Sequence, residues 1–486
     1  MRSGSCCFSG CSLFGLFCRI AMTQDSAVSD LIRQAREAQR IYEAFDQAQV
    51  DDVVAAIAWV VLEPDRNRYL SKRAVEDTGL GDVEDKFTKN YRKTLGLLRD
   101  LSGARSVGVI SEDKSKGIIE IARPVGVVGA ITPSTNPVAT PTNKVMNALK
   151  GRNAIILAPS PRGEAVCEEL VALFQDALEK VGAPRELVQK LPKPVNKADT
   201  ESLMKSVDLI VATGSQNNIR SAYSSGTPAV GVGAGNVAVI VDETADCDEA
   251  VRHVIASKTF DNATSCSSEN SLVVVEGNYE RMLGGLAAHG AILLSAQEKA
   301  ALQALMWVNG KLNPRVIARN AGEIAAMAGI SRDDGQPIKV LLVEETGAGP
   351  EYLFSGEKLS PVLAVYRAQD FSAALDTIQA IYAHQGAGHS VGIHTRTEDR
   401  PLKIGLELPT CRVIVNQAHC FATGGSFDNA LPFSLSMGCG SWGGNSISEN
   451  MNFRHYLNTV RVVSKIPPQE VSPEDLLSDF WARYGK

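Results

Sequence analysis

One cysteine lies in a setting that suits a nucleophile. Cys266 is part of the run Phe-Asp-Asn-Ala-Thr-Ser-Cys-Ser-Ser-Glu, among small polar residues, just before the β-rich run 271–275. Core packing explains such a cysteine poorly, and a thiolate is an intrinsically strong nucleophile. Because a single cysteine is more often structural, the residue types alone leave both roles open.

Polar turns after two predicted strands suit phosphate groups. Gly214 and Ser215 come where the strand 208–212 gives way to a helix, and helix N-terminal amides with a Ser hydroxyl bind phosphate well. The alternative is that Ser215 only caps the helix. Ser160 and Arg162 follow the predicted strand 154–158, at the edge of the sheet where nucleotides bind. No G-x-G-x-x-G fingerprint follows a strand, so any dinucleotide is held by another route.

The remaining cysteines indicate neither a metal site nor a disulfide framework. Four of the ten lie in the first 18 residues, and the others are scattered without C-x-x-C or zinc-ligand spacing. Reduced thiols in a cytoplasm fit this usage. His419 and Cys420 are adjacent, which leaves a Cys–His pair as an alternative catalytic arrangement, although adjacency in sequence does not establish contact.

Elements of an α/β fold position these residues. The spacing of Leu31, Ala35, Ala38, Ile41 and Phe45 predicts an amphipathic helix with a buried face, and a second such helix carries the valines of 50–61. Short apolar strands alternating with helices then predict a parallel, doubly wound sheet followed by a second α/β unit. The predicted strands are 125–132, 154–158, 208–212, 237–241, 271–275, 340–344, 362–366 and 412–416, and the predicted helices between them are about 138–149, 164–181 and 246–258.

Two features lie outside this alternation. Residues 106–122 place two β-like runs around the polar SEDKSK, which predicts a hairpin with a charged tip that serves either assembly or simply the surface. Residues 424–444 are too rich in glycine for ordinary core elements, and such stretches let the backbone approach a ligand or another chain.

Composition excludes several classes of protein. The chain has 486 residues, 44% of them hydrophobic, and a formal net charge of −6. That length corresponds to roughly three domains, and the mild acidity argues against nucleic acid or an anionic membrane as the main partner. No window approaches about 20 uninterrupted apolar residues. Residues 1–21 are apolar and interrupted by Ser and Gly without an A-x-A site, so we expect a dispensable extension rather than an export signal.

Six motifs in order resemble the CoA-acylating branch of the aldehyde dehydrogenase superfamily, over about residues 26–465. They are residues 122–137, 212–215, 262–269, 357–363, 388–394 and 438–448. The resemblance implies an α/β fold of the aldehyde dehydrogenase type, with a doubly wound cofactor domain, an α/β catalytic domain and a β-hairpin oligomerisation arm. The domains it implies are 22–105 with 123–236 for the dinucleotide, 237–454 for catalysis, and 106–122 with 455–468 as oligomerisation strands, after the extension 1–21.

The resemblance also assigns roles to residues. It makes Cys266 the catalytic thiol and Asn136 the donor to the oxyanion, without a metal. Residues that it places at the cofactor are Thr132, Pro133, Ser160, Arg162, Gly214, Ser215 and Glu357, the last of them at the nicotinamide ribose. Between the strand 154–158 and Glu164 there is no acidic residue of the kind that many NAD-preferring relatives carry. Ser160 and Arg162 suit a 2′-phosphate instead, so we expect NADP rather than NAD, with a solvent-facing Arg162 as the alternative.

One departure from the hydrolytic members indicates the acceptor. Where those carry a glutamate that activates water, this chain has Val232. Water, with a pKa near 15.7, needs a base to attack a thioester, whereas a thiol with a pKa near 8.5 is already a few per cent thiolate at neutral pH. The site is therefore biased toward coenzyme A as co-substrate. Glu269 is the alternative base, and we interpret it as structural.

The resemblance further implies a small anionic aldehyde, for which we expect sulfoacetaldehyde, with succinate semialdehyde or acetaldehyde as alternatives. A sulfonate or carboxylate requires donors, which the segment 416–423 or Thr264 and Ser265 are placed to supply. The hairpin and the β-like run 457–466 imply a homodimer or homotetramer. Competing classes are a hydrolytic dehydrogenase, an enzyme that reduces an acyl phosphate, and a binding protein that has lost the chemistry.

Overall fold

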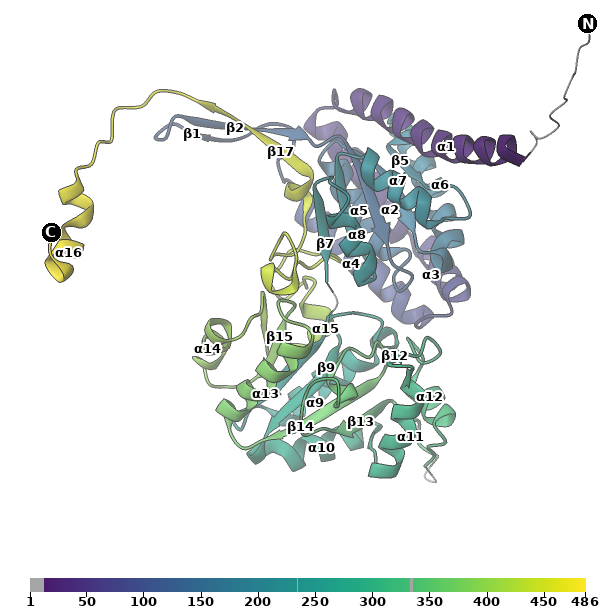
Figure 1. Ribbon diagram of the computed structural model, residues 1–486, viewed down its shortest axis with the longest axis vertical. Helices are drawn as coiled ribbons and strands as arrows, with labels where there is room; N and C mark the ends of the chain where they lie inside the picture. Colours follow the sequence, from purple (N-terminus) through teal and green to yellow (C-terminus); the bar gives the residue numbers. More distant parts are fainter. Residues whose placement is uncertain (1–12, 234, 333–334) are drawn as a thin grey trace, which may run out of the picture.

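Parallel sheets build the two lobes of the molecule, one at each end of the view in Figure 1. The structure is a computed structural model and describes residues 13–233, 235–332 and 335–486. Within these residues the strands form a five-stranded sheet, a seven-stranded sheet, a three-stranded sheet and a two-stranded ribbon. The α/β fold class predicted from the sequence is confirmed.

The first lobe contains the five-stranded parallel sheet, in the order β5-β4-β3-β6-β7. Its strands are β3 Val127–Thr132, β4 Ala154–Pro159, β5 Val188–Lys190, β6 Leu209–Thr213 and β7 Ala229–Val232. The chain runs outward from β3 to β5 and then returns to β6 on the other side of β3. The direction of winding therefore reverses between β3 and β6, and ligands of such sheets bind at the carboxyl ends next to this switch point.

The second lobe contains the seven-stranded sheet, whose strands are also all parallel, in the order β10-β13-β14-β9-β8-β15-β16. Its strands are β8 Val237–Val241, β9 Glu269–Val275, β10 Ala291–Leu293, β13 Val340–Glu344, β14 Val362–Ala368, β15 Val391–His394 and β16 Val413–Val415. The central strands β8, β9 and β14 are almost entirely buried, as expected where helices cover both faces of a parallel sheet.

The third sheet projects from the body as an arm (Figure 1). β1 Gly108–Asp113 and β2 Ile118–Pro124 form the predicted hairpin, and β17 Leu457–Val463 adds to the far edge of β2, all antiparallel. The ribbon consists of β11 Trp307–Val308 and β12 Lys311–Leu312. Val460, Val462 and Val463 of the arm are exposed.

Helices surround both sheets. In chain order they are α1 Leu13–Tyr42, α2 Gln47–Leu62, α3 Pro64–Thr78, α4 Val83–Leu101, α5 Ala139–Lys150, α6 Glu164–Lys180, α7 Lys197–Ser206, α8 Gln216–Tyr223, α9 Cys247–Thr259, α10 Tyr279–Ala288, α11 Ala296–Met306, α12 Ala321–Met327, α13 Phe371–His384, α14 Arg400–Glu407, α15 His419–Ala422 and α16 Pro473–Tyr484. In the described part of the chain, no helix combines the length and apolar character that crossing a membrane requires.

The predicted elements agree with these bounds to within a few residues, with three differences. α1 already begins at Leu13, and residues 1–12 of the predicted extension lie outside the described residues. Ile41, predicted on the buried face, is 53% exposed, because Tyr42 takes the inward position and is fully buried. Six strands of the described residues were not predicted, because each is only two to four residues long, and in two of them, β7 and β15, a glycine also interrupts the apolar pattern. They are β5, β7, β10, β11, β12 and β15.

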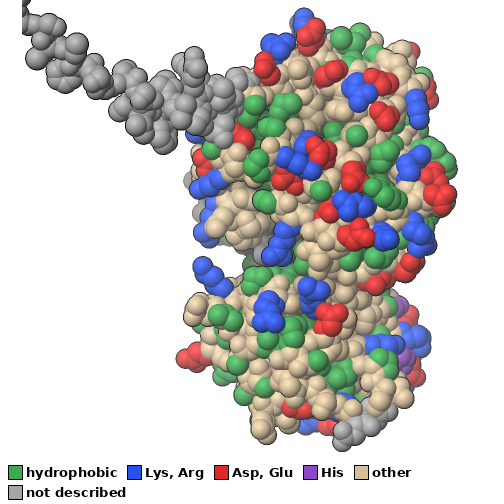
Figure 2. All heavy atoms as spheres, turned by 90° about the vertical axis from the view of Figure 1, so that its right-hand side faces the viewer, with side chains coloured by type: hydrophobic (Ala, Val, Ile, Leu, Met, Phe, Trp, Pro, Cys, Tyr) green, Lys and Arg blue, Asp and Glu red, His purple; other side chains and the backbone are tan. Residues whose placement is uncertain are grey.

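The two lobes meet along α4, which positions the site described below. Asp82 caps this helix by accepting hydrogen bonds from the backbone N–H groups of Glu84 and Asp85. A Cβ at Gly96, in the interior of α4, would lie only 2.3 Å from the Phe433 ring. The absence of a side chain here therefore lets the segment from the second lobe pack directly on α4. A space-filling view shows the surface hollowed between the lobes, with Lys and Arg side chains beside the hollow (Figure 2).

A pair of glycine substitutions tests this packing. Gly96→Ala and Gly284→Ala both gain helix propensity of about 1 kcal/mol, but a Cβ at Gly284 of α10 meets nothing within 4 Å. We therefore expect Gly284→Ala to raise the midpoint of thermal unfolding slightly. Gly96→Ala adds overpacking of about 1–3 kcal/mol and should lower the midpoint relative to it. Equal midpoints for the two variants, measured by calorimetry, would show that Phe433 is not tightly packed on α4.

Candidate active site

A strained turn presents Cys266. The segment leaves α9 through a short 3₁₀ turn, Phe260–Ala263, and Cys266 follows three residues before β9 begins. Asp261, Asn262 and Ala263 have φ angles of 51°, 51° and 56°, in the left-handed region that residues with a side chain rarely adopt. Such a conformation persists only when the surroundings impose it.

Asp261 supplies that constraint, because its buried carboxylate binds two lysines of α4. Lys86 Nζ lies 3.1 Å from Asp261 Oδ2, and Lys89 Nζ is bound to the same oxygen. Thr264 donates a hydrogen bond to it at 2.6 Å, and the backbone N–H of Asp82 donates to Oδ1 at 2.9 Å. The carboxylate is therefore surrounded by donors from both lobes, and it fixes the turn to the start of α4.

The charges in this cluster compensate one another. Burial alone raises the pKa of Asp261, but the charges of Lys89 and Lys86 and the hydrogen bonds outweigh it, so the pKa lies below its ordinary value. Burial lowers the pKa of Lys86 to about 8, against the opposing effect of Asp261. Removing one partner from such a buried group leaves an uncompensated charge, which costs about 3–5 kcal/mol.

Lys89 also orients Asn136. Its ammonium group donates a hydrogen bond of 3.0 Å to Asn136 Oδ1 and another of 3.0 Å to Thr264 Oγ1, besides its bond to Asp261. Since the carbonyl oxygen of the amide is bound by Lys89, the opposite end, Nδ2, is free to point elsewhere. Among the described residues, its one hydrogen bond is a marginal one of 3.5 Å to Thr135 Oγ1. Asn136 therefore presents an amide donor of fixed orientation.

Cys266 is partly buried in the structure. Burial raises the pKa of this thiol to about 12, the negative charges of Glu357 and Cys439 act in the same direction, and Arg412 acts against them. A Cβ at Gly235 would lie 2.0 Å from the backbone oxygen of Cys266, so glycine is required for this close approach. Without ligands the thiol is thus held mostly protonated.

Glu357 is brought to the thiol from the loop before β14. Burial raises the pKa of this carboxyl to about 8, although Lys258, Lys358 and a hydrogen bond from the backbone of Gly235 lower it. Its own backbone N–H donates to Gln385 at 3.2 Å. The predicted ribose ligand and the predicted nucleophile therefore share one electrostatic environment.

The other predicted cofactor residues lie together at the carboxyl edge of the five-stranded sheet. Thr132 ends β3 and accepts a hydrogen bond from the backbone N–H of Ser160, and Pro133 follows it. Arg162 is exposed in the 3₁₀ turn that follows β4 and makes no hydrogen bond or ion pair to any described residue. Arg162 therefore faces solvent, as the alternative prediction had it, and in this position its guanidinium group is free to bind a ligand.

Gly214 and Ser215 form the turn after β6. Gly214 has a φ of 151°, and a Cβ there would meet nothing closer than 3.9 Å. Ser215 caps α8 by accepting a hydrogen bond of 3.3 Å from the backbone N–H of Asn218. The capping role therefore exists, and it leaves the other N-terminal amides of α8 available to an anion. Because these residues lie beside the switch point, the donors fit a dinucleotide.

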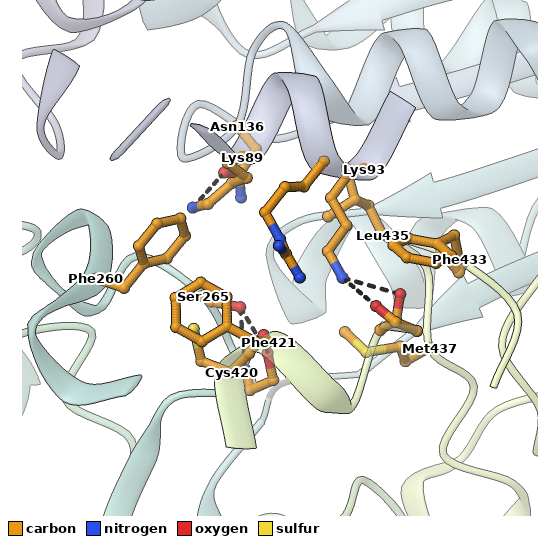
Figure 3. Close-up of a pocket in the computed structure, with 15 residues that line it drawn as sticks. Lys89, Lys93, Asn136, Phe260, Ser265, Cys420, Phe421, Phe433, Leu435 and Met437 are labelled. Atoms are coloured by element: carbon orange, nitrogen blue, oxygen red, sulfur yellow. Dashed lines mark hydrogen bonds between the residues drawn. The ribbon is translucent and has the colours of Figure 1, made fainter. Parts of the chain in front are cut away.

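A cavity lies between α4 and the cysteine turn (Figure 3). Its volume of about 530 Å³ includes open space at its mouth. Asn136, Lys89 and Lys93 line it from the first lobe, and Ser265, on one side of Cys266, lines it from the second lobe together with Phe421. Ser267, on the other side of Cys266, also lines it. The structure thus brings both neighbours of Cys266 and the predicted oxyanion donor Asn136 to one small cavity, although Cys266 itself is not among the lining residues.

Most of the side chains that were predicted to donate hydrogen bonds to the sulfonate or carboxylate of the substrate are already bonded to other residues of the protein. Ser265 lines the cavity, but Thr264 is bound to Lys89 and Asp261. The amide of Asn416 is bound to the backbone of Thr395 at 2.9 Å on both sides. His419, from the alternative Cys–His pair, is buried, and its Nδ1 bonds Thr423 rather than a cysteine.

Sequence reasoning missed the basic residues of the cavity. Lys89, Arg92 and Lys93 line it from one face of α4. Their i, i+3, i+4 spacing places them together on a helix, which is a usable signal, but the same pattern is typical of a solvated surface. Only the packing of Phe421 and Phe433 against this face distinguishes the two cases.

The sequence of this chain is similar to those of known proteins. The family model described as the aldehyde dehydrogenase family matches residues 15–301. Sulfoacetaldehyde dehydrogenase (acylating) from Cupriavidus necator is 58% identical over 466 residues, which cover 96% of this chain and 94% of that protein. The chain belongs to the aldehyde dehydrogenase family. The sequence resemblance is therefore confirmed.

Solved structures of acylating aldehyde dehydrogenases have the same fold as this aldehyde dehydrogenase. An acetylating aldehyde dehydrogenase from Geobacillus thermoglucosidasius has a TM-score of 0.89 at 37% identity, covering 93% of this chain and 99% of that one. A propionaldehyde dehydrogenase from Rhodopseudomonas palustris with bound propionyl-CoA has a TM-score of 0.81 at 25% identity, covering 90% and 94%. The expected fold, with its arm, is thus shared with acylating members of the family.

Two positions of this aldehyde dehydrogenase, Val232 and Glu269, bear on whether it has a base that could activate water. Val232, at the end of β7, is buried and offers no base. Glu269, at the start of β9, is fully enclosed, and burial raises its pKa to about 7. Its Oε2 has no hydrogen-bond partner among the described residues. Neither Glu269 nor Cys266 lines the cavity, so the cavity does not decide between the two roles, and the structural interpretation of Glu269 stays a prediction.

The pKa of Cys266 predicts its reactivity without ligands. Because the value is about 12, we expect the rate of alkylation by iodoacetamide to rise about tenfold per pH unit from about pH 7 to 10, whereas an ordinary thiol levels off near pH 9. Glu357→Gln removes a charge that raises this pKa, and it should speed labelling at about pH 9. Peptide mass spectrometry quantifies labelling of Cys266, with Cys266→Ala to confirm the site. A plateau near pH 7 would show that the free enzyme holds a thiolate.

Proposed function

We propose that this enzyme oxidises sulfoacetaldehyde to sulfoacetyl-CoA, with NAD(P) as the oxidant and a thioester on Cys266 as the intermediate. The observation that carries the proposal is the small cavity that unites the cysteine turn, the amide of Asn136 and a basic wall from α4. The 58% identity to an acylating sulfoacetaldehyde dehydrogenase supports both the substrate and the acceptor.

The first half of the reaction forms the thioester. The Cys266 thiol loses its proton, and its sulfur attacks the aldehyde carbon to give a hemithioacetal. Asn136 Nδ2 and the backbone N–H of Cys266 donate to the oxygen as it gains negative charge, which is the electrostatic stabilisation expected of an oxyanion site. When NAD(P) is bound, its nicotinamide accepts the hydride that leaves the carbon. Loss of the hydride and of the hydroxyl proton leaves an acyl group on the sulfur.

The second half transfers the acyl group to coenzyme A. The CoA thiolate attacks the thioester carbon, and the Cys266 sulfur leaves and recovers a proton. Val232 gives water no base at this stage, whereas a thiol supplies its own nucleophilic anion near neutral pH. Competition between the two acceptors therefore favours CoA.

For the cofactor, the residues that would hold it are those at the carboxyl edge of the five-stranded sheet. The turn Gly214–Ser215 would receive a phosphate, Thr132 and Pro133 would contact the nicotinamide half, and Glu357 would bind its ribose. Ser160 and the unpartnered Arg162 would receive a 2′-phosphate, which supports NADP over NAD. The exposed valines of the arm support assembly of copies through β17, as a dimer or a tetramer.

An assay of product and cofactor tests the proposal. Purified protein with sulfoacetaldehyde should reduce NADP faster than NAD, and it should do so continuously only when CoA is present, with sulfoacetyl-CoA as the product. Acetaldehyde should have a much lower kcat/KM, and Cys266→Ala should be inactive. Sustained turnover to free sulfoacetate without CoA would instead establish a hydrolytic enzyme and contradict the role given to Val232.

Two substitutions test the orientation of the oxyanion donor. Asn136→Ala should lower kcat by about 10²–10³-fold, the effect of removing one such donor. Lys89→Met leaves Asn136 in place but frees its amide to rotate, so it should also lower kcat, by less, with a smaller change in KM. Thermal unfolding is the control, since Lys89→Met also leaves Asp261 with one lysine. A folded Lys89→Met enzyme with unchanged kcat would show that Lys89 does not position Asn136.

A further inference from the structure

The cavity beside Cys266 has one wall of positive charge and no negative charge opposite it. Lys89, Arg92 and Lys93 line it from α4, and no Asp or Glu of the described residues is among its lining. The rest of the wall is largely apolar, with Phe260 and Phe421 among its members. Charges in such a poorly hydrated space interact more strongly than on an open surface.

The three basic side chains differ in how many of their N–H groups are free to bind a ligand. The ammonium of Lys89 uses its three N–H groups on Asn136, Asp261 and Thr264. Lys93 donates to the backbone oxygens of Gly424 and Gly425 at 3.0 Å each, which leaves one N–H (Figure 3). Lys89 therefore belongs to the protein framework, and Lys93 keeps a single donor for a ligand.

Arg92 retains its whole hydrogen-bonding capacity. Among the described residues it makes no hydrogen bond and no ion pair, and its recorded contact is with the Phe427 ring, 5.4 Å from the ring centre. The side chain is only half-buried, since it also borders a second, open cavity, whose lining includes His253, Gln417 and the acidic residues Glu249 and Asp428. A guanidinium offers five N–H donors in a planar fork, the geometry that binds an anionic group through two oxygens.

The guanidinium shares its cavity with both neighbours of Cys266 and with Asn136. Ser265 and Ser267, on either side of Cys266, line the same cavity as Arg92. A small aldehyde held at its anionic end by Arg92 therefore has its carbonyl group directed toward the cysteine turn and Asn136. A neutral aldehyde of the same length leaves the guanidinium without a partner in a space of low polarity.

We propose that Arg92, assisted by Lys93, is the subsite that binds the sulfonate of the substrate and selects anionic over neutral aldehydes. This inference rests on the proposed function, since it names the residue that gives that function its substrate class. Neither residue takes part in the chemistry at Cys266. Their effect is on which aldehyde is bound, and how it is oriented.

A matched pair of variants on α4 tests the assignment. Arg99 lies on the same face of the helix and contacts the same Phe427 ring at 5.4 Å, but it does not line the cavity. Arg92→Gln should lower kcat/KM for sulfoacetaldehyde about 10–100-fold more than kcat/KM for acetaldehyde, mainly through KM. Arg92→Lys should restore part of that ratio, because it keeps the charge without the fork. Arg99→Gln should leave the ratio as in the parent enzyme.

The outcomes are distinguishable from a failure of the proposed function. Equal losses for both aldehydes in Arg92→Gln, or an equal change of the ratio in Arg99→Gln, would overturn the subsite. If the parent enzyme does not oxidise sulfoacetaldehyde, the proposed substrate is wrong, and protection of Cys266 from alkylation by sulfoacetate tests the subsite separately. Protection that is lost in Arg92→Gln and kept in Arg99→Gln supports it. Protection that is the same in both variants overturns it.

Discussion

The bond between the buried carboxylate of Asp261 and the lysines of α4 is the constraint on which the site depends. It joins the turn that carries Cys266 in one lobe to a helix of the other. It also stabilises three consecutive residues in left-handed backbone conformations, and through Lys89 it fixes the amide of Asn136. A buried carboxylate with its partners removed would be costly, so the arrangement has little freedom to relax. The turn that carries Cys266 and the amide of Asn136 are thereby placed by one cluster, although they belong to different lobes.

The surroundings of Cys266 favour the protonated form of its thiol. Burial and the neighbouring Glu357 hold the thiol of Cys266 protonated, while Glu357 itself is held with its pKa near 8. A cofactor that carries positive charge on its ring and an aldehyde that excludes water both change this balance in favour of the thiolate. A thiol that is protected in the free enzyme is also protected from unwanted alkylation and oxidation.

The sequence predicted the fold well, for physical reasons, and the role of Cys266 stays a prediction. Fully buried parallel strands such as β4 and β8 have continuous apolar sequences, and the segment around Cys266 is polar where packing would require apolar residues. What could not be predicted depends on contacts between distant segments. Lys89 and Arg92 have the same spacing as surface residues of any helix, and the donors expected from Asn416 and Thr264 are committed to neighbours far away in the chain. Only the folded structure shows which donors remain free.

The most direct test of this account is to trap the intermediate. The enzyme is mixed with sulfoacetaldehyde and NADP without CoA, quenched in acid, and its peptides are analysed by mass spectrometry. We expect a sulfoacetyl group on Cys266 in proportion to the NADP reduced, and a second sample given CoA before the quench should contain unmodified Cys266 and sulfoacetyl-CoA. NADP reduction with free sulfoacetate as product and no acyl group on Cys266 would contradict the thioester mechanism.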